Sequence, residues 1–125
     1  MTQKPELPDA FLRGLDLLNR GDYFEAHEAI EAAWRAEPGG IRQLYQGILQ
    51  VAVVYYHVTR HNYYGARKVI RRAISNLSPF IEISLFDIPE IISNLETIDS
   101  RLLPLDSGRV VEISPELLLP VKLRQ

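Results

Sequence analysis

The sequence predicts an all-α protein, a compact antiparallel helical bundle, and two observations carry this prediction. Apolar residues recur at helical spacing in five successive segments, each bounded by residues that cap or break helices. Residues 110–113 would suit a short strand, but the sequence offers no second strand to pair with them. We therefore expect five helices and no sheet.

Composition and charge narrow the class of protein further. A chain of 125 residues, 46% of them hydrophobic, suits one soluble domain over residues 1–125. The absence of cysteine excludes disulfides and thiolate metal ligands. A net charge of -2 argues against general nucleic-acid binding, because phosphate neutralisation dominates that affinity. No apolar run is long enough to span a membrane and the first residues lack the apolar core of a signal peptide, so we expect a cytoplasmic protein.

The first two predicted helices have clear ends. Asp9 opens the first helix, and Gly21 ends it. Asp22 is a good N-cap for the second helix, which runs to about Glu37 and stops at a Pro-Gly-Gly turn.

The remaining helices surround an unusually apolar one. Residues 41–60 form a third helix that is apolar on most sides, so we expect it to be central and mostly buried. Asn62 caps a fourth helix over 63–77, and a fifth follows over about 87–103. Residues 104–125 contain three prolines and are expected to form an irregular tail on the bundle.

An internal repeat relates the second and fourth helices. The segment RGDYFEA at 20–26 realigns with RHNYYGA at 60–66. The pattern Asp/Asn-Tyr-x-x-Ala at a helix start resembles the second helix of tetratricopeptide hairpins, where the aromatic and the small residue pack on the preceding helix. We therefore expect two tetratricopeptide-like hairpins capped by the fifth helix. Two repeats are too few for a solenoid, which favours a bundle.

Polar residues are predicted to meet between the second and third helices. At about 100° per residue, His27 falls inside the buried arc of its helix and Glu31 follows one turn later, whereas Glu28 points to solvent. Four side chains share a stripe of the third helix at spacings of four, three and four: Gln46, Gln50, Val53 and His57. An antiparallel hairpin would place Gln50 level with His27. The same register would place Gln46 level with Glu31.

Three interpretations of this polar set compete. In the first it is structural and fixes the register of the hairpin, because buried polar groups need partners. In the second it lines a site for a polar small molecule, with His27 as acid/base and Glu31 orienting it. The candidate ligand-binding residues are then Tyr23, His27, Glu31, Trp34, Gln46, Gln50 and His57. In the third, His27, Glu31 and His57 bind a metal ion. Whether the chain is an enzyme stays open.

A different class of function is a non-catalytic adaptor or an oligomerising module. Its candidate contact surfaces are Val53, Tyr56 and the run Leu117–Leu119. The basic side of the fourth helix is expected to be mainly solvated, although it would also suit phosphate or an acidic partner: Arg67, Lys68, Arg71 and Arg72. The sequence contains no glycine-rich phosphate loop or other nucleotide-binding motif.

Three motifs follow one another in a fixed order: YFEAHE-x-x-E-x-x-W at 23–34, YQG-x-x-Q at 45–50 and N-x-x-GA at 62–66. Together they resemble the domain-of-unknown-function 309 family over about residues 10–78. Its signature positions fall on Tyr23, His27, Glu28, Glu31, Trp34, Gln46, Gly47 and Gln50. The resemblance implies a small all-helical protein, cytosolic or plastid-related, and implies no biochemical activity. His61 replaces the usual glycine, and histidine tolerates the left-handed conformation that this turn requires.

Overall fold

Five α-helices form most of the computed structural model, which describes residues 6–124. They are α1 (Asp9–Asn19), α2 (Tyr23–Ala36), α3 (Arg42–Thr59), α4 (Tyr63–Leu77) and α5 (Ile88–Leu102). Three short 3-10 helices complete the regular structure: η1 (Ser78–Phe80), η2 (Leu103–Ser107) and η3 (Pro115–Leu117). Residues 6–124 contain no strand, so the predicted all-α fold is confirmed.

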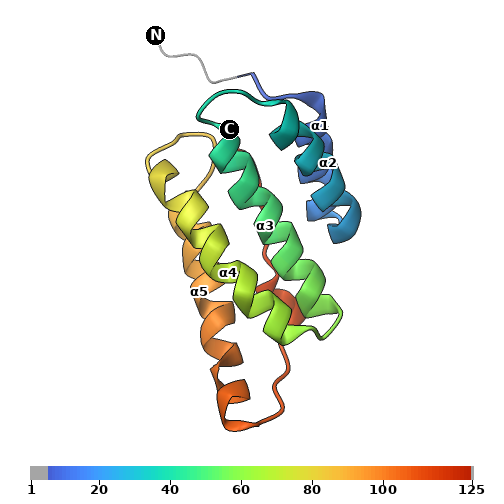
Figure 1. The fold of residues 1–125 in the computed structure, drawn as a ribbon, viewed down its shortest axis with the longest axis vertical. Coiled ribbons are helices and arrows are strands. Elements are labelled where there is room, and N and C mark those ends of the chain that lie inside the picture. Colours follow the sequence, from blue (N-terminus) through green and yellow to red (C-terminus); the bar gives the residue numbers. More distant parts are fainter. Residues whose placement is uncertain (1–5, 125) are drawn as a thin grey trace.

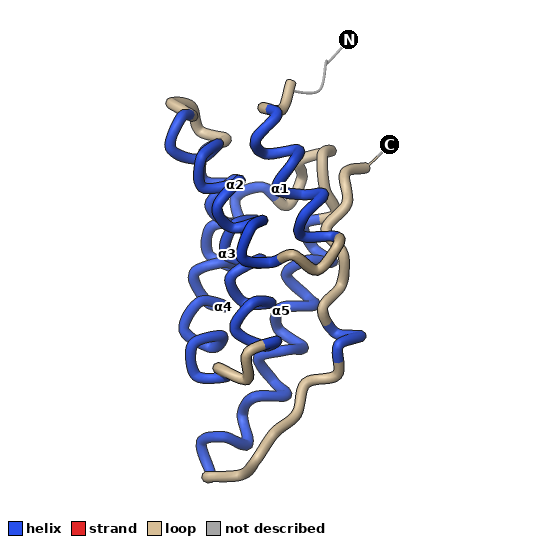
Figure 2. The backbone as a smooth tube through the Cα atoms, turned by 90° about the vertical axis from the view of Figure 1, so that its right-hand side faces the viewer, coloured by secondary structure: helices blue, strands red, loops and turns tan. Residues whose placement is uncertain are grey.

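Consecutive helices run antiparallel and pack on one another in chain order (Figure 1). After α5 the chain turns and runs back along the bundle (Figure 2). The structure therefore confirms the compact antiparallel bundle, while the likeness of its two hairpins to tetratricopeptide repeats stays a prediction. No helix of the described chain has both the length and the apolarity of a membrane-spanning segment.

The predicted central position of α3 is confirmed by its burial. Half of its residues are buried: Leu44, Tyr45, Gly47, Ile48, Val51, Ala52, Val54, Tyr55 and Val58. At one end the ring of Tyr45 lies 4.4 Å from that of Phe11 on α1, centroid to centroid. The ring of Phe86, in the segment before α5, meets Phe11 edge-on at 6.2 Å. Residues of α1 and of the segment before α5 thus share one core with α3.

A buried hydrogen-bond network holds the C-terminal segment on the bundle. The amide nitrogen of Asn94 on α5 donates to the hydroxyl of Tyr55 at 3.1 Å and to the carbonyl of Leu117 at 3.0 Å. The Tyr55 hydroxyl in turn donates to the carbonyl of Leu119 at 2.8 Å. Because these polar atoms lie away from water, each bond satisfies a group that would otherwise be costly to bury.

The run Leu117–Leu119 therefore belongs to the fold. Leu117 and Leu118 pack against the core, and Leu119 is 36% exposed. Just beyond, Asn19 of α1 bonds both backbone groups of Val121, accepting from its nitrogen and donating to its carbonyl. The segment is thus bound to α1, α3 and α5, and its leucines do not form the free contact surface that the sequence suggested.

The two hairpins end their first helices with the same turn. Gly21 follows α1 with φ 88° and His61 follows α3 with φ 57°. His61 thus adopts the left-handed conformation expected of it. Asn62 caps α4 by accepting from the Gly65 nitrogen at 3.1 Å, as predicted. Asp22 occupies the predicted N-cap position of α2, but its side chain makes no cap hydrogen bond and instead lies 3.5 Å from the guanidinium of Arg20.

Replacing Gly47 with alanine should destabilise the protein. A Cβ at this position would lie 2.6 Å from Cδ2 and 2.8 Å from Cγ of Leu77 on α4, whose side chain is fully buried. We expect a net loss of about 1–2 kcal/mol in the free energy of unfolding, the overpacking cost less the higher helix propensity of alanine. Urea denaturation measures it. Gly40→Ala is the control, because its Cβ would meet nothing within 4 Å. Equal losses in the two variants would refute the packing explanation.

Candidate functional site

Three charged side chains form a row along the outer side of α2. His27 Nε2 lies 3.2 Å from Oε2 of Glu31, and the other carboxylate oxygen of Glu31 pairs with Arg35. The spacing of four residues places all three on one side of the helix. His27 is 30% exposed and Glu31 29%, so the pair is half-buried. Glu28 points to solvent, as predicted.

Beside this row of charged side chains lies an apolar hollow of about 190 Å³, which we call the α2–α3 hollow. Its lining residues are Phe24, His27, Val53, Tyr56 and His57. The ring of Phe24 lies 6.0 Å from that of His27 and 5.6 Å from that of Tyr56, centroid to centroid. Phe24 nevertheless keeps 46% of its surface exposed. An aromatic ring is therefore presented to solvent at the junction of the two helices.

His27 also borders a second, charged hollow of about 290 Å³ on α2. This hollow shares Phe24 and His27 with the first and adds Glu28, Glu31, Ala32 and Arg35. One face of the histidine thus meets aromatic and aliphatic side chains, whereas its Nε2 edge meets a carboxylate. The site can hold an apolar group and a charged group side by side.

His57 closes the α2–α3 hollow at the end of α3. Its Nδ1 lies 3.1 Å from the side-chain nitrogen of Asn62. An amide nitrogen can only donate, so the neutral imidazole accepts this bond at Nδ1. Burial lowers the pKa of His57 below its ordinary value, because a cation loses hydration there. His57 is accordingly a neutral rim of the hollow near pH 7.

The predicted hairpin register differs from the observed one. His27 faces Val53 and Tyr56, which lie further along α3 than Gln50. Gln50 instead accepts a hydrogen bond of 2.8 Å from Asn76 on α4. The side chain of Gln46 lines the same region between α3 and α4. The structure therefore divides the expected polar set between two hollows, one towards α2 and one towards α4.

Tyr23 and Trp34 lie at the edges of the site and have structural contacts. The ring of Tyr23 meets that of Tyr55 edge-on at 5.4 Å, and desolvation raises the pKa of Tyr23. The guanidinium of Arg42 lies 4.1 Å above the ring of Trp34, and its Nε donates to the Trp34 carbonyl at 2.9 Å. Trp34 thus joins the ends of α2 and α3.

His27, Glu31 and His57, the residues of the metal-binding interpretation, are not assembled into a ligand set. Across residues 6–124 no group of three or more histidine, aspartate or glutamate side chains is placed to hold a metal ion. His27 and Glu31 are paired, but Nδ1 of His57 is directed to Asn62.

Sequence reasoning missed Phe24 and Arg35. Phe24 lies outside the apolar stripe of α2, and a large aromatic residue at an expected polar position was the available signal. Arg35 follows Glu31 by four residues, a spacing that predicts an ion pair. Phe24 lies against the ring of His27, and Arg35 pairs with the Glu31 carboxylate that His27 also contacts.

His57→Gln should reduce the loss of stability on acidification. Because burial lowers the pKa of folded His57 below 6.5, the unfolded chain takes up a proton at a higher pH than the folded one. Stability should therefore fall as the pH drops through 6.5 towards the folded pKa, and this contribution should vanish above that range. Urea unfolding at mildly alkaline and mildly acidic pH measures the drop. An equal drop in wild type and variant would contradict the expectation.

Comparison with known proteins agrees with the motifs. Residues 11–69 match a family model described as "Domain of unknown function (DUF309)". The chain is similar to an uncharacterized protein, YpuF, of Bacillus subtilis, with 41% identity over 54 residues. That match covers 42% of this chain and 31% of the Bacillus protein, so the chain spans under a third of that relative's length. No solved structure matches the chain. Residues 11–69, which include most of α1 and all of α2 and α3, thus match the DUF309 family that the motifs indicated.

Proposed function

We propose that the protein is a non-catalytic interaction module that binds an apolar side chain of a protein partner in the α2–α3 hollow. The observation that carries this proposal is the position of Phe24, 46% exposed although its ring contacts those of His27 and Tyr56. An aromatic side chain fixed in place gains much from burial by a partner and loses little entropy. Val53 extends the same apolar surface.

Charge around the hollow indicates the chemistry of the partner. Glu25 and Glu28 are exposed on α2 and form no ion pair with any described residue. Glu31 already shares its carboxylate between His27 and Arg35. An apolar side chain flanked by basic residues would complement this surface, since opposite charges at the rim steer association.

The geometry favours binding over catalysis. A catalytic histidine is most effective in a pocket that encloses the substrate and excludes water. The hollows beside His27 lie at the surface, and both oxygens of Glu31 are engaged by neighbours on the same helix. His27 is therefore better placed to border a bound side chain than to carry a proton in a reaction.

A blocked peptide with phenylalanine between two lysines tests the proposal. Amide NMR spectra of the protein should show saturable shifts at Phe24, Val53 and Tyr56 as this peptide is added. Phe24→Ala should weaken binding by about tenfold, the loss expected for one aromatic contact. A peptide with glutamates in place of the lysines should bind less tightly.

Leu12→Ala is the matched control, because Leu12 is an exposed apolar residue of α1, 40% accessible and outside the hollow. Its affinity for the peptide should equal that of wild type. The proposal fails if the lysine peptide gives no saturable shifts, or if Phe24→Ala and Leu12→Ala bind it equally well.

A polar small molecule at His27 is the second candidate, favoured by the 3.2 Å contact between His27 and Glu31. This reading predicts a co-purifying compound in native mass spectrometry of the wild-type protein. The compound should be absent from His27→Gln, which keeps the side chain polar but removes the acid/base group. Wild-type protein that consistently carries no compound would argue against this candidate.

A further inference from the structure

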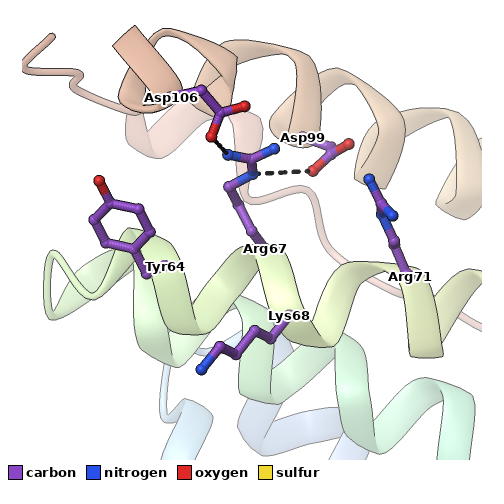
Figure 3. Close-up of a pocket in the computed structure, with 6 residues that line it drawn as sticks. All are labelled: Tyr64, Arg67, Lys68, Arg71, Asp99 and Asp106. Carbon is purple, nitrogen blue, oxygen red and sulfur yellow. Dashed lines mark hydrogen bonds and ion pairs between the residues drawn. The ribbon is translucent and has the colours of Figure 1, made fainter. Parts of the chain in front are cut away.

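The basic residues of α4 have two different roles. The helix contains four basic residues and no acidic one. Arg67 is only 19% exposed and binds Asp106 at 2.6 Å, with Asp99 at 3.9 Å, so carboxylates of η2 and α5 offset its charge. Figure 3 shows Arg67 directed towards these two acids, while Lys68 points away from them. Arg67 is therefore part of the fold.

The other basic residues of α4 are free for a ligand. Lys68, Arg71 and Arg72 are exposed and form no ion pair within the described part of the chain. Arg71 lies near Asp99 in Figure 3, but only Arg67 is joined to that carboxylate. Arg71 thus lies beside a carboxylate without forming an ion pair with it. The positive charges of Lys68, Arg71 and Arg72 fall within two turns, so this side of α4 attracts anions.

Two of these arginines border a polar hollow of about 330 Å³, here named the α3–α4 hollow. Its lining residues are Gln46, Gln50, Arg71, Arg72, Ser75 and Asn76. No carboxylate is among them. This hollow is bordered by α4, whereas the α2–α3 hollow is bordered by α2, and the two share no residue.

The hydrogen bond between the two helices leaves donors facing this hollow. Asn76 donates to the carbonyl oxygen of Gln50 at 2.8 Å, which occupies the acceptor end of the Gln50 amide. The Gln50 amino group then remains available as a donor. Ser75 adds a hydroxyl, and the two guanidinium groups add planar forks that match the oxygens of an oxyanion.

We infer that the α3–α4 hollow binds a phosphate group. A carboxylate carries one charge on two oxygens, and a single arginine fork already satisfies it. A phosphate monoester carries nearly two charges and three strongly accepting oxygens. Arg71, Arg72 and the Gln50 amide together supply the charge and the donors that such a group requires. This site requires no glycine-rich loop, since side chains of two packed helices build it.

Titration with inorganic phosphate, at ionic strength held constant with chloride, tests the inference on the full chain. Amide and guanidinium NMR signals of Gln50, Arg71, Arg72 and Asn76 should shift and saturate. The double variant R71Q/R72Q should bind at least about tenfold more weakly, since each exchange removes a charge-assisted hydrogen bond. The double variant R13Q/R109Q, an equal charge change at two exposed arginines outside the hollow, should leave the affinity unchanged.

Glycerol phosphate distinguishes the source of the group. Tighter binding of the ester indicates a phosphorylated molecule as ligand, and tighter binding of inorganic phosphate indicates the free ion; both results support the site. The inference is overturned if the shifts do not saturate, if R13Q/R109Q weakens binding as much as R71Q/R72Q does, or if acetate binds as tightly as phosphate. The peptide test of the α2–α3 hollow reports on different residues, so the two proposals fail independently.

Discussion

The burial of α3 between α2 and α4 is the constraint on which the rest of the structure depends. It buries half of the residues of α3, and Gly47 lets α4 approach so closely that a Cβ there would overlap Leu77. Because close-packed interiors tolerate little change in volume, α3 has one position between its neighbours. Its solvent-facing side is reduced to a stripe, and that stripe carries the polar residues that the sequence singled out: Gln46, Gln50 and His57.

The stripe divides the surface into two regions of different chemistry. Towards α2, Val53 and Tyr56 meet the exposed ring of Phe24, beside unpaired carboxylates of α2. Towards α4, amide side chains meet unpaired arginines. Acidic and basic sides on flanking helices would keep two ligands apart, because each ligand is repelled from the wrong region. Both proposed sites therefore follow from the way in which α3 separates its neighbours.

The internal repeat shows how one backbone pattern can serve different purposes. His27 on α2 and Arg67 on α4 are equivalent under the offset of the repeat. Arg67 finds carboxylates on α5 and η2, so its charge stabilises the contact between the second hairpin and the segment that follows. His27 finds Glu31 on its own helix and remains half-exposed. The C-terminal part of the chain thus covers the second hairpin at Arg67. The equivalent position of the first hairpin, His27, stays accessible to solvent.

The sequence by itself determined the helices, because caps, breakers and apolar spacing are local. It located all five helices, the buried role of α3 and the left-handed turn at His61. It also identified His27 and Glu31 as a pair, since a spacing of four residues brings side chains together on any helix. Only the tertiary structure decided that Gln50 meets Asn76 rather than His27 and that Asp106 binds Arg67. Periodicity defines which face of a helix is buried, but the sliding of one helix along another and contacts between distant segments depend on the packing of the whole core.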